Sequence, residues 1–204
     1  MKHSPGYRND VSRETWERLE AYVSLLLRWN RTINLISRSD EAQIWSRHID
    51  DSLDLTRLLP SSFSHATDLG SGGGLPGLVL AIATNHPFHL IEADQRKAAF
   101  LREAARTVGA AVTVYASRIE AAAPPPAPVI TARALAPLSQ LITWALPHLA
   151  PHGVCIFPKG RASAAELSDA QKEWTMRVET TPSTLDPTAC IYSISEIARA
   201  NNVH

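Results

Sequence analysis

Several features that would assign a protein to a class are missing from this chain. It has no apolar run long enough to span a bilayer, and it opens with polar residues, so we expect neither a membrane segment nor a signal peptide. We therefore expect a cytoplasmic protein. Its two cysteines, Cys155 and Cys190, form no CxxC motif and lie in apolar runs, which predicts reduced cysteines in the core.

A net charge and a metal-binding pattern are missing as well. The 20 basic and 20 acidic residues balance to +0, so nucleic-acid binding would have to depend on a local patch. His86 and His89 flank Pro87, and two further histidines flank Pro151, without more ligands at useful spacing. We expect no metal. No internal repeat is evident, and 204 residues with 45% hydrophobic content suffice for one core.

From residue 63 onward, short apolar runs alternate with helical patterns. This alternation predicts an α/β fold, a doubly wound and mainly parallel sheet of the Rossmann-like type. The expected strands cover residues 63–69, 88–92, 112–115, 129–131, 154–157, 176–181 and 190–194, and the expected helices cover 77–84, 95–108, 137–149 and 162–174.

The first 60 residues have a helical pattern instead. Ser12 can cap a helix whose apolar positions, from Trp16 to Ile33, recur at steps of three and four residues. A second helix is expected to start at Asp40, with Gln43 as its capping partner, and to stop before residue 60. We therefore predict an N-terminal helical extension over 1–60 and a core over 61–204, within one compact domain.

The turn from Asp68 to Gly77 is the most informative stretch. An acidic residue ends a strand, and glycines at Gly70 and Gly72 permit positive φ and close approach to a ligand. A G-x-G-x-x-G pattern begins at Gly72, but the tight turn must follow the strand at once, and counted from Gly70 the dinucleotide spacing fails at Leu75. No Gly-Lys-Ser/Thr closes the run, which excludes a P-loop.

The acid at the turn indicates which ligand is expected. Asp68 would repel a pyrophosphate but attract an ammonium, and S-adenosylmethionine has an ammonium beside its sulfonium. Glu92 ends the next strand about 20 residues later, the spacing at which an acid reaches ribose hydroxyls. Asp94 could share that task or cap the helix that follows it.

Ligands of doubly wound sheets bind at the carboxyl ends of the strands, so the residues that follow each strand are the candidates. The predicted cofactor-binding residues are Asp68, Gly70, Ser71, Gly72, Gly74, Leu75, Glu92, Ala93, Arg118, Ile119, Glu120 and Arg133.

Several blocks, in one order, resemble a known family. The runs 29–35, 47–53 and 68–77, followed by Arg96-Lys97, the segment 117–120, the segment 132–136 and Lys159-Gly160, are similar to the bacterial 16S rRNA 7-methylguanosine methyltransferases, RsmG, also called glucose-inhibited division protein B. The resemblance covers roughly residues 29–160. Thr32 stands where members commonly carry a basic residue, and Thr188 lies where they carry an arginine.

The resemblance implies a class I S-adenosylmethionine-dependent methyltransferase that acts on guanine N7 in the decoding-region loop of 16S rRNA. It places His48, Asp51, Arg133 and Lys159 on the RNA-facing and methyl-facing side. His48, Arg133 and Lys159 are the catalytic candidates, although His48 could instead be a core histidine bonded to a carbonyl. The expected RNA-binding residues are Arg28, Arg31, Arg47, Arg133 and Lys159, and the expected partner is 16S rRNA or the small subunit, bound by a monomer.

The chemistry of N7 fits what the chain lacks. Guanine N7 has a free lone pair and no proton, so attack on a sulfonium methyl needs neither a general base nor a nucleophile. The fourth strand accordingly ends in Ala132-Arg133, without the Asn/Asp-Pro-Pro-aromatic motif used for exocyclic amines or a Pro-Cys nucleophile. Arg133 could fork onto guanine O6 or a phosphate.

Two other functions stay open from the sequence. In a small-molecule methyltransferase the helical N-terminus would be a lid, whereas a basic face formed by Arg28, Arg31, Arg38 and Arg47 would favour RNA. A non-catalytic nucleotide-binding module would bind the cofactor without turnover.

Overall fold

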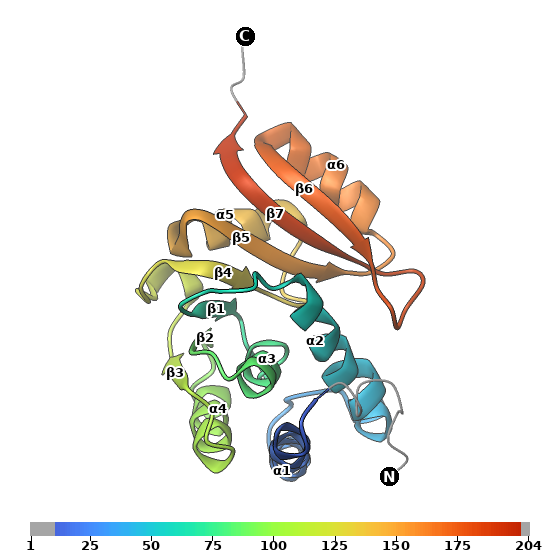
Figure 1. Cartoon of the computed structure of the whole chain (residues 1–204), viewed down its shortest axis with the longest axis vertical. Helices are drawn as coiled ribbons and strands as arrows, with labels where there is room; N and C mark the ends of the chain where they lie inside the picture. Colours follow the sequence, from blue (N-terminus) through green and yellow to red (C-terminus); the bar gives the residue numbers. More distant parts are fainter. Residues whose placement is uncertain (1–10, 201–204) are drawn as a thin grey trace.

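A seven-stranded sheet forms the centre of the molecule in a computed structural model, which describes residues 11–200 (Figure 1). The strand order is β3-β2-β1-β4-β5-β7-β6. Strands β1 to β5 are parallel, β7 is antiparallel to β5, and β6 is antiparallel to β7. The predicted doubly wound, mainly parallel sheet is confirmed. The strands are β1 Ala66–Leu69, β2 Phe88–Ile91, β3 Val112–Tyr115, β4 Ala127–Thr131, β5 Leu149–Lys159, β6 Trp174–Pro182 and β7 Cys190–Arg199.

Helices cover both faces of this sheet. One face packs against α1 Arg13–Asn30, α3 Gly77–Thr84 and α4 Gln95–Thr107, and the other packs against α5 Leu138–Ala145 and α6 Ser163–Glu173 (Figure 1). The strands supply both cores by alternation, because Phe88 and Leu90 face the first group while Ile91 faces the second. Strands buried on both faces read as continuous apolar runs, which is why they could be found in the sequence.

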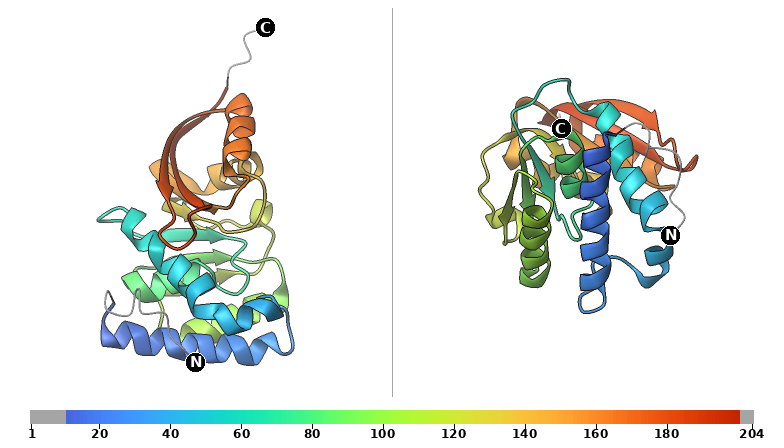
Figure 2. Two further views of the ribbon diagram at one scale, coloured as in Figure 1. Left: turned by 90° about the vertical axis from the view of Figure 1, so that its right-hand side faces the viewer. Right: turned by 60° about the horizontal axis from the view of Figure 1, so that its bottom comes forward.

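The N-terminal helix packs on the sheet domain rather than standing apart from it. Ser12 caps α1 as predicted, its side chain accepting from the Thr15 amide. Tyr22 and Trp29 on α1 lie with Phe100 of α4, at ring-centroid distances of 6.4 and 5.8 Å. Figure 2 shows α1 running along one face beside α4. One continuous core therefore crosses residue 60, and the division there stays a prediction; residues 1–10 of the expected extension lie outside the described residues.

The second predicted helix is wrong in its form. Residues 38–58 make a broken chain of turns, namely the 3-10 helix η1 Arg38–Gln43, the π-helical turn η2 Trp45–Ile49, the α-helix α2 Asp50–Asp54 and the 3-10 helix η3 Leu55–Leu58. The N-cap is Ser37, whose hydroxyl accepts from the Asp40 amide at 3.2 Å, so the Asp40–Gln43 capping pair does not form. Tertiary packing explains the break, since Trp45 stacks on Trp16 with ring centroids 4.6 Å apart. π-turns of this kind are frequent at functional sites.

Other boundaries shift by a few residues. The expected helix 137–149 ends at Ala145 and continues as the 3-10 turn η5 Leu146–His148, which contains Pro147, while η4 Ile119–Ala121 follows β3. Strand β5 is longer than its apolar run. Cys155 on β5 is buried and Cys190 on β7 is half-buried, both as free thiols. Within residues 11–200, no helix is long and apolar enough to cross a membrane.

Candidate active site

The glycine turn joins β1 to α3 and exposes its backbone. Gly70 and Gly72 have φ values of 62° and 54°, as predicted. A Cβ on Gly70 would lie 2.6 Å from Leu135 Cδ1, whereas on Gly72 the nearest atom, the Gly70 carbonyl oxygen, would be 3.8 Å away. Gly70 therefore permits a close approach of the chain, and Gly72 leaves the inside of the turn open. Tyr22 of α1 fixes the turn from behind, its hydroxyl donating to the Gly73 carbonyl.

Asp68 lies beneath this turn rather than on a cavity wall. Its side chain is fully buried, Oδ1 accepts from Thr131 Oγ1 at 2.6 Å, and Oδ2 has no hydrogen-bond partner among the described residues. Burial raises the pKa of this carboxyl to about 6. A buried carboxylate oxygen without a partner is costly, and an ammonium would supply the missing donor. This orphaned oxygen fits S-adenosylmethionine, although its contact with the ammonium stays a prediction.

Glu92 clamps the turn to the loop after β2. Its Oε2 accepts from the Gly72 amide and its Oε1 from the Asp94 amide, both at 2.8 Å. Each oxygen keeps a lone pair that a ribose hydroxyl could use. Asp94 caps α4, its Oδ1 accepting from the Arg96 and Lys97 amides, which is the second of its two expected roles.

A cavity of about 350 Å³, called here the cofactor cavity, opens beside the clamp. Eight of the predicted cofactor-binding residues line it, namely Gly70, Gly72, Glu92, Ala93, Arg118, Ile119, Glu120 and Arg133. Lys97, Leu135 and Trp144 also line it and were not among the predicted cofactor-binding residues, although Lys97 and Leu135 belong to the blocks that carry the family resemblance. Trp144 Nε1 donates to Glu120 Oε1 at 2.8 Å. Trp144 comes from α5, and no local pattern in the sequence brings it to this wall.

The remaining turn residues lie elsewhere. Ser71 and Leu75 line a smaller neighbouring cavity of about 180 Å³, the junction cavity, together with His48 and Arg133. Gly74 faces the protein interior, where a Cβ would lie 2.9 Å from that of Leu78, so its position serves packing.

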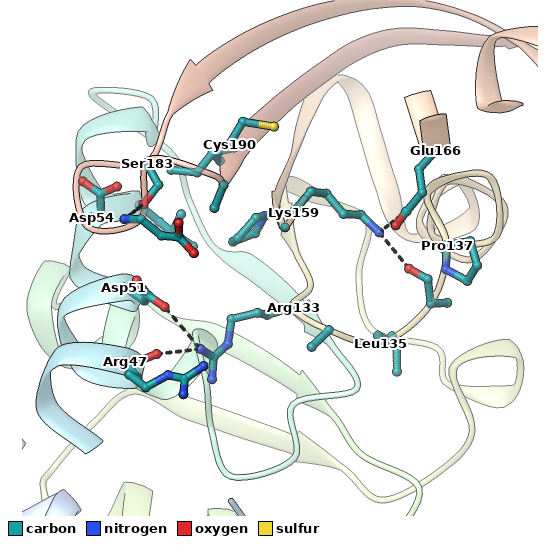
Figure 3. A pocket seen from close by; sticks show the side chains of 18 residues that line it. Arg47, Asp51, Asp54, Arg133, Leu135, Pro137, Lys159, Glu166, Ser183 and Cys190 are labelled. Carbon is teal, nitrogen blue, oxygen red and sulfur yellow. Dashed lines mark hydrogen bonds and ion pairs between the residues drawn. The ribbon is translucent and has the colours of Figure 1, made fainter. Parts of the chain in front are cut away.

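Arg133 connects all of these spaces. It follows β4, its side chain is 19% exposed, and it lines the cofactor cavity, the junction cavity and a third, larger cavity. Its Nη2 lies 3.0 Å from His48 Nδ1, and its Nη1 donates to the Arg47 carbonyl at 3.3 Å and lies 3.9 Å from Asp51 Oδ2 (Figure 3 shows the Arg47 and Asp51 contacts). The π-turn and α2 therefore fix this guanidinium from one side.

His48 is the partner of Arg133 on the π-turn. A guanidinium only donates, so His48 Nδ1 accepts from Arg133, and His48 Nε2 lies 3.6 Å from Asp40 Oδ2. Burial, together with the charge of Arg133, lowers the pKa of His48 to about 4. His48 thus orients Arg133 in the structure, whereas the sequence left open whether it belongs to the core or to the site.

The larger cavity, called here the large cavity, measures about 690 Å³ and lies between α2, the loop after β4 and the β6–β7 hairpin (Figure 3). Lys159 lines it and is only 9% exposed. Its ammonium donates to Glu166 Oε2 at 2.7 Å and to the Ala136 carbonyl at 2.8 Å. The charge of Lys159 is therefore paired with that of Glu166, and the sequence did not predict this ion pair.

The other predicted RNA-binding arginines have separate surroundings. Arg28 pairs with Glu103 of α4 at 3.3 Å, and Arg47 pairs with Asp40 at 3.2 Å while lining the large cavity. Arg31 and Arg38 are exposed and make no ion pair within residues 11–200. For metals, those residues contain no group of three or more His, Cys, Asp or Glu side chains that could hold an ion.

Comparison with solved structures shows the fold. An O-methyltransferase from Bacillus cereus in complex with SAH is 14% identical, with a TM-score of 0.57 over 86% of this chain and 90% of that one. A ribosomal protein L11 methylase from Lactobacillus delbrueckii is 17% identical, with a TM-score of 0.56 over 71% and 75%. The topology and the glycine turn define the class I methyltransferase fold.

Comparison of sequences shows the family. The family model described as rRNA small subunit methyltransferase G matches residues 15–188, beyond the blocks that end at Gly160. A ribosomal RNA small subunit methyltransferase G from Gluconobacter oxydans is 56% identical over 93% of this chain and 97% of that protein. A second, from Rhodospirillum centenum, is 54% identical over 92% and 87%. This chain belongs to the rRNA small subunit methyltransferase G family, as the resemblance predicted.

Proposed function

We propose that this chain transfers the methyl group of S-adenosylmethionine to N7 of a guanosine in the decoding-region loop of 16S rRNA. Membership of the rRNA small subunit methyltransferase G family supports this substrate over a small molecule and over a non-catalytic module. One observation carries the mechanism: Arg133 forms part of the wall of both the cofactor cavity and the large cavity. A base in the large cavity and a cofactor in the other would meet at this residue.

The residues of the cofactor cavity would bind and orient S-adenosylmethionine and would take no chemical part in the transfer. When bound, S-adenosylmethionine supplies an electrophilic methyl group on its sulfonium. Glu92 and the Gly72 backbone are the groups that would hold its ribose, and the orphaned oxygen of Asp68 would accept from its ammonium. The side chains of Trp144 and Leu135 line the cofactor cavity and would shield part of a bound cofactor from water.

The substrate side needs alignment and no proton transfer. Because N7 carries a lone pair and no proton, the residues near it have to orient the base and leave that lone pair free. Arg133 is suited to donate to O6 beside N7, with His48 and the Arg47 carbonyl holding its guanidinium. Lys159 acts on the same loop through the Ala136 carbonyl, which makes it a positioning residue in this proposal.

Exposed arginines outside the cavities would bind the phosphates of the RNA. Arg31 and Arg38 are exposed, and Arg38 directly follows Ser37 of the junction cavity. Arg28 and Arg47 are paired with acidic residues but remain mostly exposed, so they add positive charge. We also propose that the protein acts as a monomer in the cytoplasm.

Methyl transfer with purified protein tests the function. Tritiated S-adenosylmethionine is incubated with the protein and either naked 16S rRNA or small subunits from cells that lack it, and the RNA is digested to nucleosides. The expected label is in 7-methylguanosine, and comparing the two substrates shows which form is used. Small subunits from wild-type cells, already methylated, should take up little label. Label in another nucleoside, or in none, would overturn the proposal.

A further inference from the structure

One carboxylate in the large cavity differs from the others there. Asp51, Asp54, Glu166 and Asp186 all line the cavity. Three of them already accept hydrogen bonds from protein groups: Asp54 from Arg57 and Thr184, Glu166 from Lys159 and Leu138, and Asp186 from Thr188. Asp51 accepts none from any residue in the range 11–200, and its side chain is 38% exposed. Its carboxylate is thus available to a ligand.

The neighbour of Asp51 is Arg133. Asp51 Oδ2 lies 3.9 Å from Arg133 Nη1, too far for a hydrogen bond, so neither group uses a donor or acceptor on the other (Figure 3). Arg133 donates once to the Arg47 carbonyl and once to His48, which leaves further N–H groups of its guanidinium for a ligand. Side by side, they present a donor next to two acceptor oxygens. The edge of guanine that is complementary to this set has the O6 acceptor followed by the N1–H and N2 amino donors.

The order of atoms around guanine matches the order of the cavities. Going round the ring, N7 is followed by O6, then N1–H, then the N2 amino group. Arg133 lies on the wall shared with the cofactor cavity, whereas Asp51 lines the large cavity and neither of the two smaller cavities described above. A base that places O6 at Arg133 and its N1 and N2 donors at Asp51 would turn N7 toward the cofactor cavity.

We propose that Asp51 is the residue that selects guanine, its carboxylate accepting from N1–H and the N2 amino group while Arg133 donates to O6. This inference rests on the proposed function, because it concerns the base presented to the cofactor. Adenine lacks the N1 proton and has an amino group in place of O6, so it would leave Asp51 unpaired and place a donor against Arg133.

Replacing guanosine by inosine at the target tests this selection, because inosine keeps N7, O6 and N1–H and lacks only the N2 amino group. The probes are 16S rRNA molecules joined by splinted ligation with guanosine or inosine at that position, offered naked and in reconstituted small subunits. Methyl transfer to each is measured for the wild type and for the Asp51→Ala and Asp51→Asn variants. Asp186→Ala is the matched control, since its carboxylate lines the same cavity but bonds within its own loop.

The wild type should prefer guanosine over inosine by about ten-fold or more, and Asp51→Ala should reduce this preference to within about three-fold. Asp186→Ala should keep the wild-type preference whatever its absolute rate. An Asp51→Ala variant that is slower but still prefers guanosine as the wild type does would mean that Asp51 only positions Arg133, which overturns the inference. Equal use of both bases by the wild type would overturn it as well. No transfer to guanosine by the wild type would instead contradict the proposed function.

Discussion

The cofactor cavity and the large cavity are adjacent but are built in different ways. The cofactor cavity depends on backbone, with two glycines at positive φ and Glu92 clamping amide groups across its floor. The large cavity depends on charged side chains from segments far apart in the chain, such as Arg47, Lys159 and Asp186. The first is suited to a ligand that is the same in every methyltransferase of this class, and we propose that the second binds a particular base. Arg133 belongs to both.

Replacing Arg133 should give the largest difference between the effect on methyl transfer and the effect on cofactor binding. We expect Arg133→Ala to lower methyl transfer to rRNA by about 100-fold, the scale for losing one preorganised donor, while affinity for S-adenosylmethionine stays within about three-fold. Arg133→Lys is the matched control, and it should recover little because a lysine has no fork. Calorimetry and single-turnover transfer measure the two quantities. An equal loss of affinity and rate would show that Arg133 serves the cofactor alone.

The acids at the glycine turn should affect the cofactor side only. We expect Asp68→Ala and Glu92→Ala each to weaken S-adenosylmethionine binding by about 1.5–3 kcal/mol, as for hydrogen bonds to charged groups, and we expect no binding of NAD. Asp68→Asn keeps the shape of the buried side chain and separates charge from packing. Asp94→Ala, which removes only a helix cap, should leave affinity unchanged. Unaltered affinity in both the Asp68→Ala and Glu92→Ala variants would contradict the assignment of these two residues to the cofactor site.

The neutral histidine at the boundary predicts a pH effect. The pKa of His48, lowered to about 4 by burial, lies below the ordinary value of 6.5, so between these values the unfolded chain binds a proton that the folded chain does not. Its contribution to the free energy of unfolding is therefore lost as pH falls from about 6.5 to about 4. Relative to His48→Gln, the wild type should lose about 1–3 kcal/mol across this range in urea titrations. Using the difference cancels Asp68, whose raised pKa acts in the opposite direction. Parallel curves for the two proteins would contradict a neutral His48.

Lys159 should give the smallest effect. Because its ammonium is paired with Glu166 and the Ala136 carbonyl, we expect Lys159→Ala to slow methyl transfer by about three-fold to ten-fold, less than Arg133→Ala. RNA binding should weaken as salt rises, and a lysine that only positions the loop should leave the salt slope unchanged. A slope reduced by about one unit would mean that Lys159 contacts a phosphate. Glu166→Gln is the control, since it removes the negative charge of the partner and keeps the lysine.

The difference between the cavities also explains what the sequence could predict. The glycine turn and Glu92 were found because their geometry is local, and a strand, a turn and an acid at fixed spacing define it. Trp144 and Tyr22 were not found, since each reaches the site from a helix distant in sequence. We expected a regular helix where the structure has the π-turn that carries His48. The stacking of Trp45 on Trp16, which accompanies the break, is a tertiary contact that the local sequence does not reveal. That Asp51 accepts no hydrogen bond within residues 11–200, unlike the other carboxylates of the large cavity, could be recognised only from the structure.

Chemical cleavage of cellular rRNA tests the central claim most directly. Methylation at N7 makes the guanosine labile after reduction, so borohydride and aniline should cut 16S rRNA at one position in the decoding-region loop of wild-type cells. The cut should disappear when the gene is deleted, return with the wild-type chain, and stay absent with Arg133→Ala. A cut that persists in the deletion strain, or that no strain shows, would contradict N7 methylation by this protein.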